Sequence, residues 1–296
     1  MSLRVALATT VLGALIAGAC STDPVAPPGD GVEAPAGTAD AAASPSETSP
    51  WPSEPGVGLQ RWTVRVVREL DHDPGAFTQG LERVPAGIVE GTGRRGQSTL
   101  RLVDPTSGEV LRSRSLAADY FGEGVTVVGD EIVQLTWTSG IAFRYDVVTF
   151  EPIGSYRYEG EGWGLCFDGV DVWMSDGSSR LTRRDPASFA VLGDVEVRRD
   201  GAPVEDLNEL ECIGGFVTAN VWKSSEIVVI DPASGSVVAS IDASPLVEAI
   251  ELADPGPGDP DAVLNGIADL GDGTLLLGGK LWPRSFVVEL VPVDDD

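Results

Sequence analysis

Residues 121–158, FGEGVTVVGDEIVQLTWTSGIAFRYDVVTFEPIGSYRY, contain four short apolar runs separated by turn signals. The runs cover Gly122–Val128, Glu131–Thr136, Ala142–Asp146 and Ile153–Tyr158. They are rich in β-branched and aromatic residues, and Gly-Asp and Ser-Gly pairs lie between them. Both features are typical of short antiparallel strands joined by turns. The stretch therefore predicts one four-stranded unit of β-sheet.

The same plan recurs along the chain. Five short phrases each open such a unit: Gly80-Leu81, Gly124-Val125, Gly164-Leu165, Glu209-Leu210 and Gly266-Ile267. Their spacings are 44, 40, 45 and 57 residues. In the third unit the predicted strands are Gly164–Phe167, Val172–Ser175, Arg180–Arg184 and Val191–Val197. Periods of roughly 40–50 residues without a helical pattern are typical of propeller blades. The chain is therefore predicted to be all-β, as a five-bladed β-propeller.

The last unit is one strand short. It contains only three strand-like runs, Gly266–Ala268, Thr274–Gly278 and Ser285–Pro292, whereas Trp62–Leu70 reads as a strand outside any unit. We expect this amino-terminal strand to close the last blade, which leaves no open sheet edge. An open β-sandwich would not explain why one strand is surplus at one end and missing at the other.

The residues before the predicted propeller have the composition of an export segment. Residues 1–19 combine an early basic residue, an apolar run and small residues, the layout of a signal peptide. Cys20 follows three small residues, which indicates a lipoprotein-type signal peptide and lipidation of Cys20, with ordinary cleavage as the alternative. Residues 20–58 are rich in Pro, Ala, Gly and Ser and read as a disordered tether. Residues 59–296 are predicted to form the propeller, exported and anchored to the cell membrane only through the lipid.

Acidic residues outnumber basic residues by 46 to 20, and the formal net charge is −26. This charge disfavours nucleic acid and anionic membrane surfaces as partners, because both would repel the protein. It is compatible with a substrate that carries a positive α-amine. With its sheet edges closed and this charge, we expect the protein to be a monomer.

Two cysteines follow Cys20 in the sequence. Cys166 comes just after the phrase Gly164-Leu165, and Cys212 lies at the equivalent place in the next unit. Neighbouring inner strands would bring the two thiols together, and an exported protein meets an oxidising environment. A disulfide between Cys166 and Cys212 is therefore predicted, with two buried free thiols as the alternative.

The chain has a single histidine, His72. A Ser-His-Asp triad, a Cys-His pair or a histidine-rich zinc centre would need other residues in its place. His72 lies in a turn-like stretch before the first unit and is interpreted as structural. No phosphate-binding glycine loop or dinucleotide fingerprint occurs between a strand and a helix.

Polar and aromatic residues gather at equivalent places in the units. One set opens the units: Phe77–Gly80, Phe121–Gly124, Glu161–Gly164, Leu207–Glu211 and Leu264–Gly266. A second set lies one strand later: Gln134–Trp137, Met174–Gly177, Ala219–Trp222 and Gly279–Pro283. In a propeller the first strands line the axis and the loops before them meet at one mouth, so these sets should converge. Trp137, Trp163 and Trp222 are accordingly interpreted as site residues rather than core.

Nine phrases in these sets carry a family resemblance. In order between Arg61 and Leu290 they are HDPGAFTQGL, FGEGVT, IVQLTW, EGWGL, MSDGSS, LNELE, ANVW, LNGIA and GKLWP. They resemble the glutamine cyclotransferase family, the plant and bacterial type of glutaminyl-peptide cyclotransferase. The resemblance implies a five-bladed propeller that converts N-terminal glutamine of peptides or proteins to pyroglutamate and releases ammonia, without a catalytic metal or other cofactor. It also implies a structural calcium in plant relatives, whose ligands this sequence does not identify.

The resemblance identifies candidate site residues as well. It makes Glu123 the acid/base, a role that requires a pKa raised by apolar surroundings. The other pocket positions it implies are Phe77, Gln79, Phe121, Trp137, Trp163, Asn208, Trp222 and Lys280. Gln79 and Asn208 are expected to hydrogen-bond the substrate amide and peptide carbonyl, and Lys280 or an amide donor to stabilise the oxyanion. The aromatic residues are expected to enclose the glutamine side chain.

Two other hypotheses use the same residues. A non-catalytic cell-surface propeller would bind a peptide or glycan at this mouth, but it would have no use for Glu123 beside Lys280. A calcium-dependent propeller lactonase would need axial oxygen ligands, for which the candidates are Asn208, Glu209, Asn220 and Asn265. An acidic, proline-rich insertion at residues 243–262 is a candidate lid at the mouth. The sequence does not identify the natural substrate or its preferred length.

Overall fold

The structure is a computed structural model and describes residues 58–253 and 258–293. These residues form 22 β-strands and one α-helix, which confirms the all-β prediction. The predicted signal peptide, Cys20 and nearly all of the predicted tether lie outside the described residues. Within the described ranges, no helix has both the length and the apolar character needed to span a membrane.

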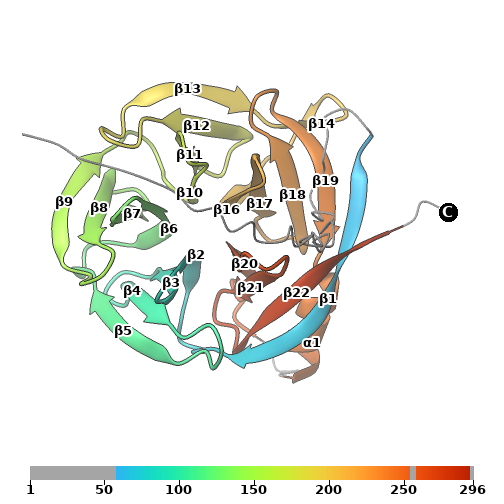
Figure 1. Ribbon diagram of the computed structural model, residues 1–296, viewed down its shortest axis with the longest axis horizontal. Helices are drawn as coiled ribbons and strands as arrows, with labels where there is room; N and C mark the ends of the chain where they lie inside the picture. Colours follow the sequence, from blue (N-terminus) through green and yellow to red (C-terminus); the bar gives the residue numbers. More distant parts are fainter. Residues whose placement is uncertain (1–57, 254–257, 294–296) are drawn as a thin grey trace, which may run out of the picture. The chain divides into compact units, whose positions relative to one another are not determined.

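Three separate four-stranded sheets follow one another in chain order, each an up-and-down meander (Figure 1). The first contains β2 (Thr78–Val84), β3 (Gly87–Thr92), β4 (Thr99–Val103) and β5 (Val110–Ser115). The second contains β6 (Gly122–Val128), β7 (Glu131–Thr136), β8 (Ile141–Asp146) and β9 (Pro152–Arg157). The third contains β10 (Leu165–Phe167), β11 (Val172–Ser175), β12 (Arg180–Arg184) and β13 (Val191–Glu196). The strands predicted for the second and third units agree with these bounds to within one residue.

The remaining strands form a ten-stranded sheet that contains two further meanders. One consists of β16 (Leu207–Ile213), β17 (Phe216–Val221), β18 (Glu226–Asp231) and β19 (Ser236–Asp242). The other consists of β20 (Leu264–Asp269), β21 (Leu275–Gly279), β22 (Arg284–Pro292) and β1 (Gln60–Asp71). A short hairpin, β14 (Arg198–Arg199) and β15 (Ala202–Pro203), pairs with β19.

The amino-terminal strand β1 joins these two meanders. It pairs antiparallel with β22, from Trp62 opposite Pro292 to Asp71 opposite Arg284. Its first residues pair in parallel with β19. The amino-terminal strand therefore supplies the fourth strand of the last meander, as the sequence predicted.

The first strand of every meander faces a common centre (Figure 1). These inner strands β2, β6, β10, β16 and β20 contact one another in succession, and β20 also contacts β2. Their approach is close: a Cβ atom on Gly124 would lie 2.6 Å from the carbonyl oxygen of Trp163, and one on Gly164 would lie 2.2 Å from that of Asn208. Only glycine fits at such positions, which explains why glycine recurs in the opening phrases. The arrangement is consistent with a propeller.

The hydrophobic core lies between neighbouring sheets. Val133 and Leu135 of β7, for example, pack with Leu165 and Met174 of the next sheet. Burying one such side chain contributes about 1.5–3 kcal/mol. This packing sets the orientation of each sheet against its neighbour, and with it the position of the loops that face the centre.

The candidate lid at residues 243–262 is partly helical. Helix α1 (Ser244–Ala253) places Leu246 in the core cluster that includes residues of β1, β18 and β22. Part of the insertion therefore packs as core. Asp261, near its end, lines the cavity described below.

A disulfide links two adjacent inner strands. It joins Cys166 on β10 to Cys212 on β16, and the Cα atoms are 5.3 Å apart. The two residues have a sequence separation of 46, so the bond closes a long loop of the unfolded chain.

Replacing both cysteines with serine should lower the free energy of unfolding by about 2–4 kcal/mol, because the unfolded chain regains the entropy of that loop. Urea denaturation without reductant, followed by tryptophan fluorescence, measures the change. Reductant should destabilise the wild-type protein similarly and leave the double variant unchanged. Equal midpoints for the wild-type protein and the double variant would show that the bond adds no stability.

Candidate active site

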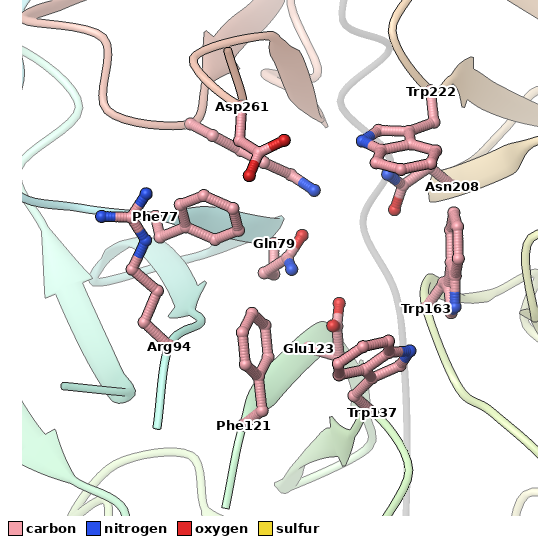
Figure 2. A pocket seen from close by; sticks show the side chains of 11 residues that line it. Phe77, Gln79, Arg94, Phe121, Glu123, Trp137, Trp163, Asn208, Trp222 and Asp261 are labelled. Carbon is pink, nitrogen blue, oxygen red and sulfur yellow. The ribbon is translucent and has the colours of Figure 1, made fainter. Parts of the chain in front are cut away.

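A cavity of about 290 Å³ lies where the inner strands begin (Figure 2). Its lining residues are Phe77, Gln79, Arg94, Phe121, Glu123, Trp137, Trp163, Asn208, Trp222, Asp261 and Lys280. They include every catalytic and substrate-binding candidate identified from the sequence. All five meanders, widely separated along the chain, contribute to this cavity.

Strand direction explains this convergence. Glu123 lies at the start of the first strand of its meander, whereas Trp137 follows the end of the second strand. Because these two strands are antiparallel, the start of one and the end of the other lie at the same edge of the sheet. Asn208 and Trp222 repeat the arrangement on β16 and β17. The second and fourth meanders therefore each present the start of the first strand and the end of the second strand to the cavity.

Aromatic rings form much of the cavity wall. Phe121 contacts Phe77 edge-on with ring centroids 6.0 Å apart, and contacts Trp137 with centroids 5.6 Å apart. Trp163 and Trp222 form a second edge-on pair at 5.5 Å. Edge-on contacts of this kind are favourable and orient the rings. The wall suits an aliphatic chain with polar ends.

Glu123 is 5% exposed and directs its carboxyl group into the cavity (Figure 2). None of the described residues hydrogen-bonds this carboxyl group, so it is open to a ligand. Burial raises the pKa of Glu123 well above its ordinary value, the charge of Lys280 opposes this rise, and the charge of Glu161 adds to it. A carboxyl group with a raised pKa can accept and return a proton near neutral pH.

Lys280 supplies a cation to the same cavity. It is 4% exposed, and burial lowers its pKa to about 8, against the opposing influence of Glu123 and Asp261. The ammonium group therefore stays mostly charged at neutral pH. Its Nζ atom lies 5.1 Å from the centroid of the Phe77 ring, a cation–π contact.

Two buried amides complete the polar lining. Gln79 Oε1 accepts a hydrogen bond of 3.2 Å from Asn265 Nδ2, which orients the Gln79 side chain. Asn208 Oδ1 is buried and has no hydrogen-bond partner among the residues described. A buried acceptor without a partner is destabilising by about 1–3 kcal/mol. An N–H group of a ligand would remove this penalty.

Arg94 lines the cavity but was not among the predicted site residues. Its Nη2 atom donates a hydrogen bond of 2.6 Å to Asp259, and its guanidinium lies 4.6 Å from the centroid of the Phe77 ring. Arg94 follows the second strand of the first meander, one residue after Gly93. Gly93 is the equivalent of Trp137, because its N–H binds the Phe77 carbonyl oxygen as the N–H of Trp137 binds that of Phe121. The repeat therefore pointed to this segment but not to Arg94 itself.

Asp261 also lines the cavity without having been predicted. Its Oδ1 atom lies 3.5 Å from Lys223 Nζ, and its backbone N–H donates a hydrogen bond of 3.0 Å to Asp259 Oδ1. Asp261 belongs to the insertion, which has no counterpart in the other units, so the repeat offered no signal for it. The end of the insertion thus contributes to the cavity wall, and its role as a lid stays a prediction.

His72 lies outside the cavity lining and holds two segments together. Its Nδ1 atom lies 2.6 Å from the carbonyl oxygen of Trp282, and its Nε2 atom lies 2.9 Å from Glu90 Oε1. Burial lowers the pKa of His72, but the hydrogen bonds to Glu90 and Trp282 and the charge of Glu90 together outweigh this, so the pKa is higher than usual. Through these two contacts His72 ties the turn after Lys280 to the end of β1. This agrees with its interpretation as structural.

The axial Asn and Glu residues bind backbone groups of the inner strands. Asn220 Oδ1 accepts a hydrogen bond of 3.0 Å from β20, and Glu209 Oε1 accepts one of 3.2 Å from β2. Asn265 Nδ2 donates one of 3.0 Å to β2. In the part of the chain that the structure describes, no three His, Cys, Asp or Glu side chains are grouped to hold a metal ion. No ligands are therefore assigned to the calcium that the resemblance implied.

Comparisons with known proteins identify the family to which the chain is similar. The family model described as Glutamine cyclotransferase matches residues 37–290. A glutaminyl-peptide cyclotransferase of Arabidopsis thaliana is 40% identical over 232 residues, which is 77% of this chain and 71% of the relative. The crystal structure of Myxococcus xanthus glutaminyl cyclase is 41% identical and has a TM-score of 0.75, covering 80% of this chain and 100% of that chain.

The fold and the cavity define an all-β protein with a buried carboxyl group and an ammonium group inside an aromatic wall. Together with these matches, they show the family plainly: the chain belongs to the glutamine cyclotransferase family.

Three further carboxyl groups lie along the inner strands. Glu209 and Glu211 on β16 are buried, and Glu82 on β2 is partly buried. Loss of contact with water raises the pKa of all three, that of Glu82 from 4.5 to about 7. Each therefore favours its protonated form in the folded protein.

These raised pKa values predict a stability that depends on pH. The contribution of Glu82 is fully present below about 4.5 and is lost as pH rises through about 7. The variant Glu82→Gln, which stays neutral and can still accept the bond from Thr126, should lose less stability over this range. Urea denaturation at a series of pH values measures the difference, with exposed Glu109→Gln as the control. Parallel curves for the wild-type protein and Glu82→Gln would contradict the prediction.

Proposed function

We propose that this chain is a glutaminyl-peptide cyclotransferase, which closes the N-terminal glutamine of peptides or proteins into pyroglutamate and releases ammonia. The observation that carries the proposal is the carboxyl group of Glu123, buried and free of hydrogen bonds, beside Lys280 in the aromatic cavity. Membership of the glutamine cyclotransferase family supports the proposal, and so does the Arabidopsis relative, whose name states this activity.

Glu123 transfers the proton in the proposed reaction. The neutral α-amine of the substrate attacks the γ-amide carbon, a new C–N bond forms, and the bond from this carbon to the amide nitrogen breaks. One proton leaves the attacking nitrogen, and one must reach the departing nitrogen. Glu123 as carboxylate accepts the first proton and delivers it to the leaving group, so that ammonia departs and Glu123 is regenerated. Its raised pKa makes the carboxylate a stronger base than an ordinary glutamate.

Lys280, Asn208 and Gln79 bind the other polar groups of the substrate. The ammonium of Lys280 stabilises the negative charge that develops on the amide oxygen as the tetrahedral centre forms. Asn208 Oδ1, which lacks a protein partner, accepts a hydrogen bond from an N–H group of the substrate. Gln79, held by Asn265, hydrogen-bonds the substrate amide or peptide carbonyl.

The aromatic wall orients the substrate. The glutamine side chain has several rotatable bonds and must fold back for its γ-amide to meet the α-amine. Rings on several sides of the cavity restrict this chain, which lowers the entropic part of the barrier. They also keep water away from the amide, so that hydrolysis does not compete.

We further propose that residues 59–296 form a five-bladed propeller. The three separate meanders and the two meanders joined through β1 support five blades. The successive contacts of the five inner strands, including that of β20 with β2, support a closed ring.

The location of the protein is also a proposal, based on composition. The signal-like residues 1–19 support export, and the small residues before Cys20 support a lipid anchor at the membrane. Residues 20–58 would then act as a tether for the catalytic domain. The charge of −26 supports a monomer that binds peptides or proteins with N-terminal glutamine and no nucleic acid.

Replacing Glu123 with Gln should lower turnover by about 10²–10⁴-fold, because the amide cannot carry the proton. Ammonia release from a dipeptide that begins with glutamine, together with the matching loss of mass from the peptide, measures turnover. Exposed Glu109→Gln is the control and should stay active, and circular dichroism checks folding. Peptide binding without turnover by the wild-type protein would instead favour the non-catalytic binding hypothesis.

Truncating Trp163 to Ala should raise KM and lower kcat together, because the ring both binds the side chain and restricts it. Trp163→Phe should retain much of the activity. Steady-state kinetics on the same dipeptide separate the two constants. An alanine variant with wild-type constants would place Trp163 outside the working site.

A further inference from the structure

The aromatic wall consists of two groups of rings. One group runs from Phe77 through Phe121 to Trp137, and the other is the pair Trp163 and Trp222. Among the described residues no ring contact joins Trp137 to Trp163. Figure 2 shows these two rings on adjacent sides of the cavity, with their indole nitrogens turned toward the gap between them. Ring contacts alone therefore leave the relative orientation of the two groups undetermined.

Glu161 bridges this gap. Its Oε2 atom accepts a hydrogen bond of 2.6 Å from Trp137 Nε1 and another of 2.9 Å from Trp163 Nε1. An ionised carboxylate makes stronger hydrogen bonds than a neutral acceptor. A single oxygen atom thus determines where both indole edges lie.

The loop that carries Glu161 is itself held by backbone contacts. The N–H of Gly162 donates a hydrogen bond of 3.0 Å to the carbonyl oxygen of Trp137, and the N–H of Trp163 donates one of 3.0 Å to Ser175. A Cβ atom on Gly162 would lie 2.7 Å from the hydroxyl oxygen of Tyr158, so this position leaves no room for a side chain. The carboxylate of Glu161 is therefore presented to the two rings by a supported backbone.

We propose that Glu161 is a positioning residue that locks Trp137 and Trp163 into one continuous wall around the substrate glutamine. The proposal rests on the proposed function. Glu161 belongs to a phrase predicted to converge at the mouth, but it was not among the candidate site residues and does not line the cavity. It acts through the two tryptophans. Without it, each indole is free to rotate away from the side chain that it should restrict.

Glu161 also places a negative charge near Glu123. This charge contributes to the rise in the pKa of Glu123, after the larger effect of burial. Holding the rings and supplying the charge are separable effects. A glutamine at this position can still accept both indole hydrogen bonds through its amide oxygen, but it carries no charge.

The test compares Glu161→Ala, Glu161→Gln and the matched control Glu159→Ala, which removes an exposed carboxylate from the same loop. On a glutamine-initiated dipeptide, kcat/KM should fall about tenfold in Glu161→Ala, mainly through KM, because two hydrogen bonds are lost. It should stay within about threefold of wild type in Glu161→Gln, where both bonds can form. The acid limb of the pH profile should move to lower pH in Glu161→Gln and stay in place in Glu159→Ala.

Indole N–H resonances report the bonds directly. The full chain has seven tryptophans, and the variants Trp137→Phe and Trp163→Phe assign the two relevant signals. In Glu161→Ala both signals should move upfield, as expected for lost hydrogen bonds, while the others stay in place. Unmoved signals, or an unchanged kcat/KM in Glu161→Ala, would overturn the proposal. A wild-type protein that turns over no glutamine peptide would overturn the proposed function instead, and the resonances would still decide whether Glu161 holds the rings.

Discussion

The close approach of the inner strands is the constraint on which the rest of the structure depends. A side chain at Gly124 or Gly164 would overlap the backbone of the neighbouring strand, so the strands can pack at this distance only with glycine there. Packing at this distance brings the starts of the inner strands to one place. Glu123 stands between Gly122 and Gly124, and a Cβ atom on Gly122 would itself lie 2.7 Å from the Thr92 carbonyl oxygen. The residues that require close packing therefore adjoin the residue proposed to transfer the proton.

The same packing changes the acid–base chemistry of the cavity. In water a glutamate and a lysine would both be fully ionised at neutral pH. Burial instead raises the pKa of Glu123 and lowers that of Lys280 to about 8, so both groups become able to exchange protons. This gives a physical basis for general acid–base catalysis without histidine. The single histidine, His72, contributes to the architecture by holding the turn that follows Lys280.

The strands and their order were predictable because their signals are local. Alternating apolar residues and turn residues placed the strands of the second and third units to within one residue. The pairing of Trp62–Leu70 with the end of the chain followed from counting strands in a closed repeat. Helix α1 was not predicted, because its acidic, proline-rich surroundings resemble a loop and Leu246 is its one fully buried residue. Asp261 was not predicted because the insertion that carries it has no counterpart in the other units.

By itself the sequence determined the all-β class, the repeat, the family resemblance and nine of the eleven side chains that line the cavity. All of these depend on short phrases and their spacing. Only the tertiary structure decided how these side chains act on one another. The raised pKa of Glu123, the unpartnered oxygen of Asn208 and the double hydrogen bond at Glu161 depend on how the units pack against one another. Burial and hydrogen bonding depend on three-dimensional contacts, which form only when the sheets have packed.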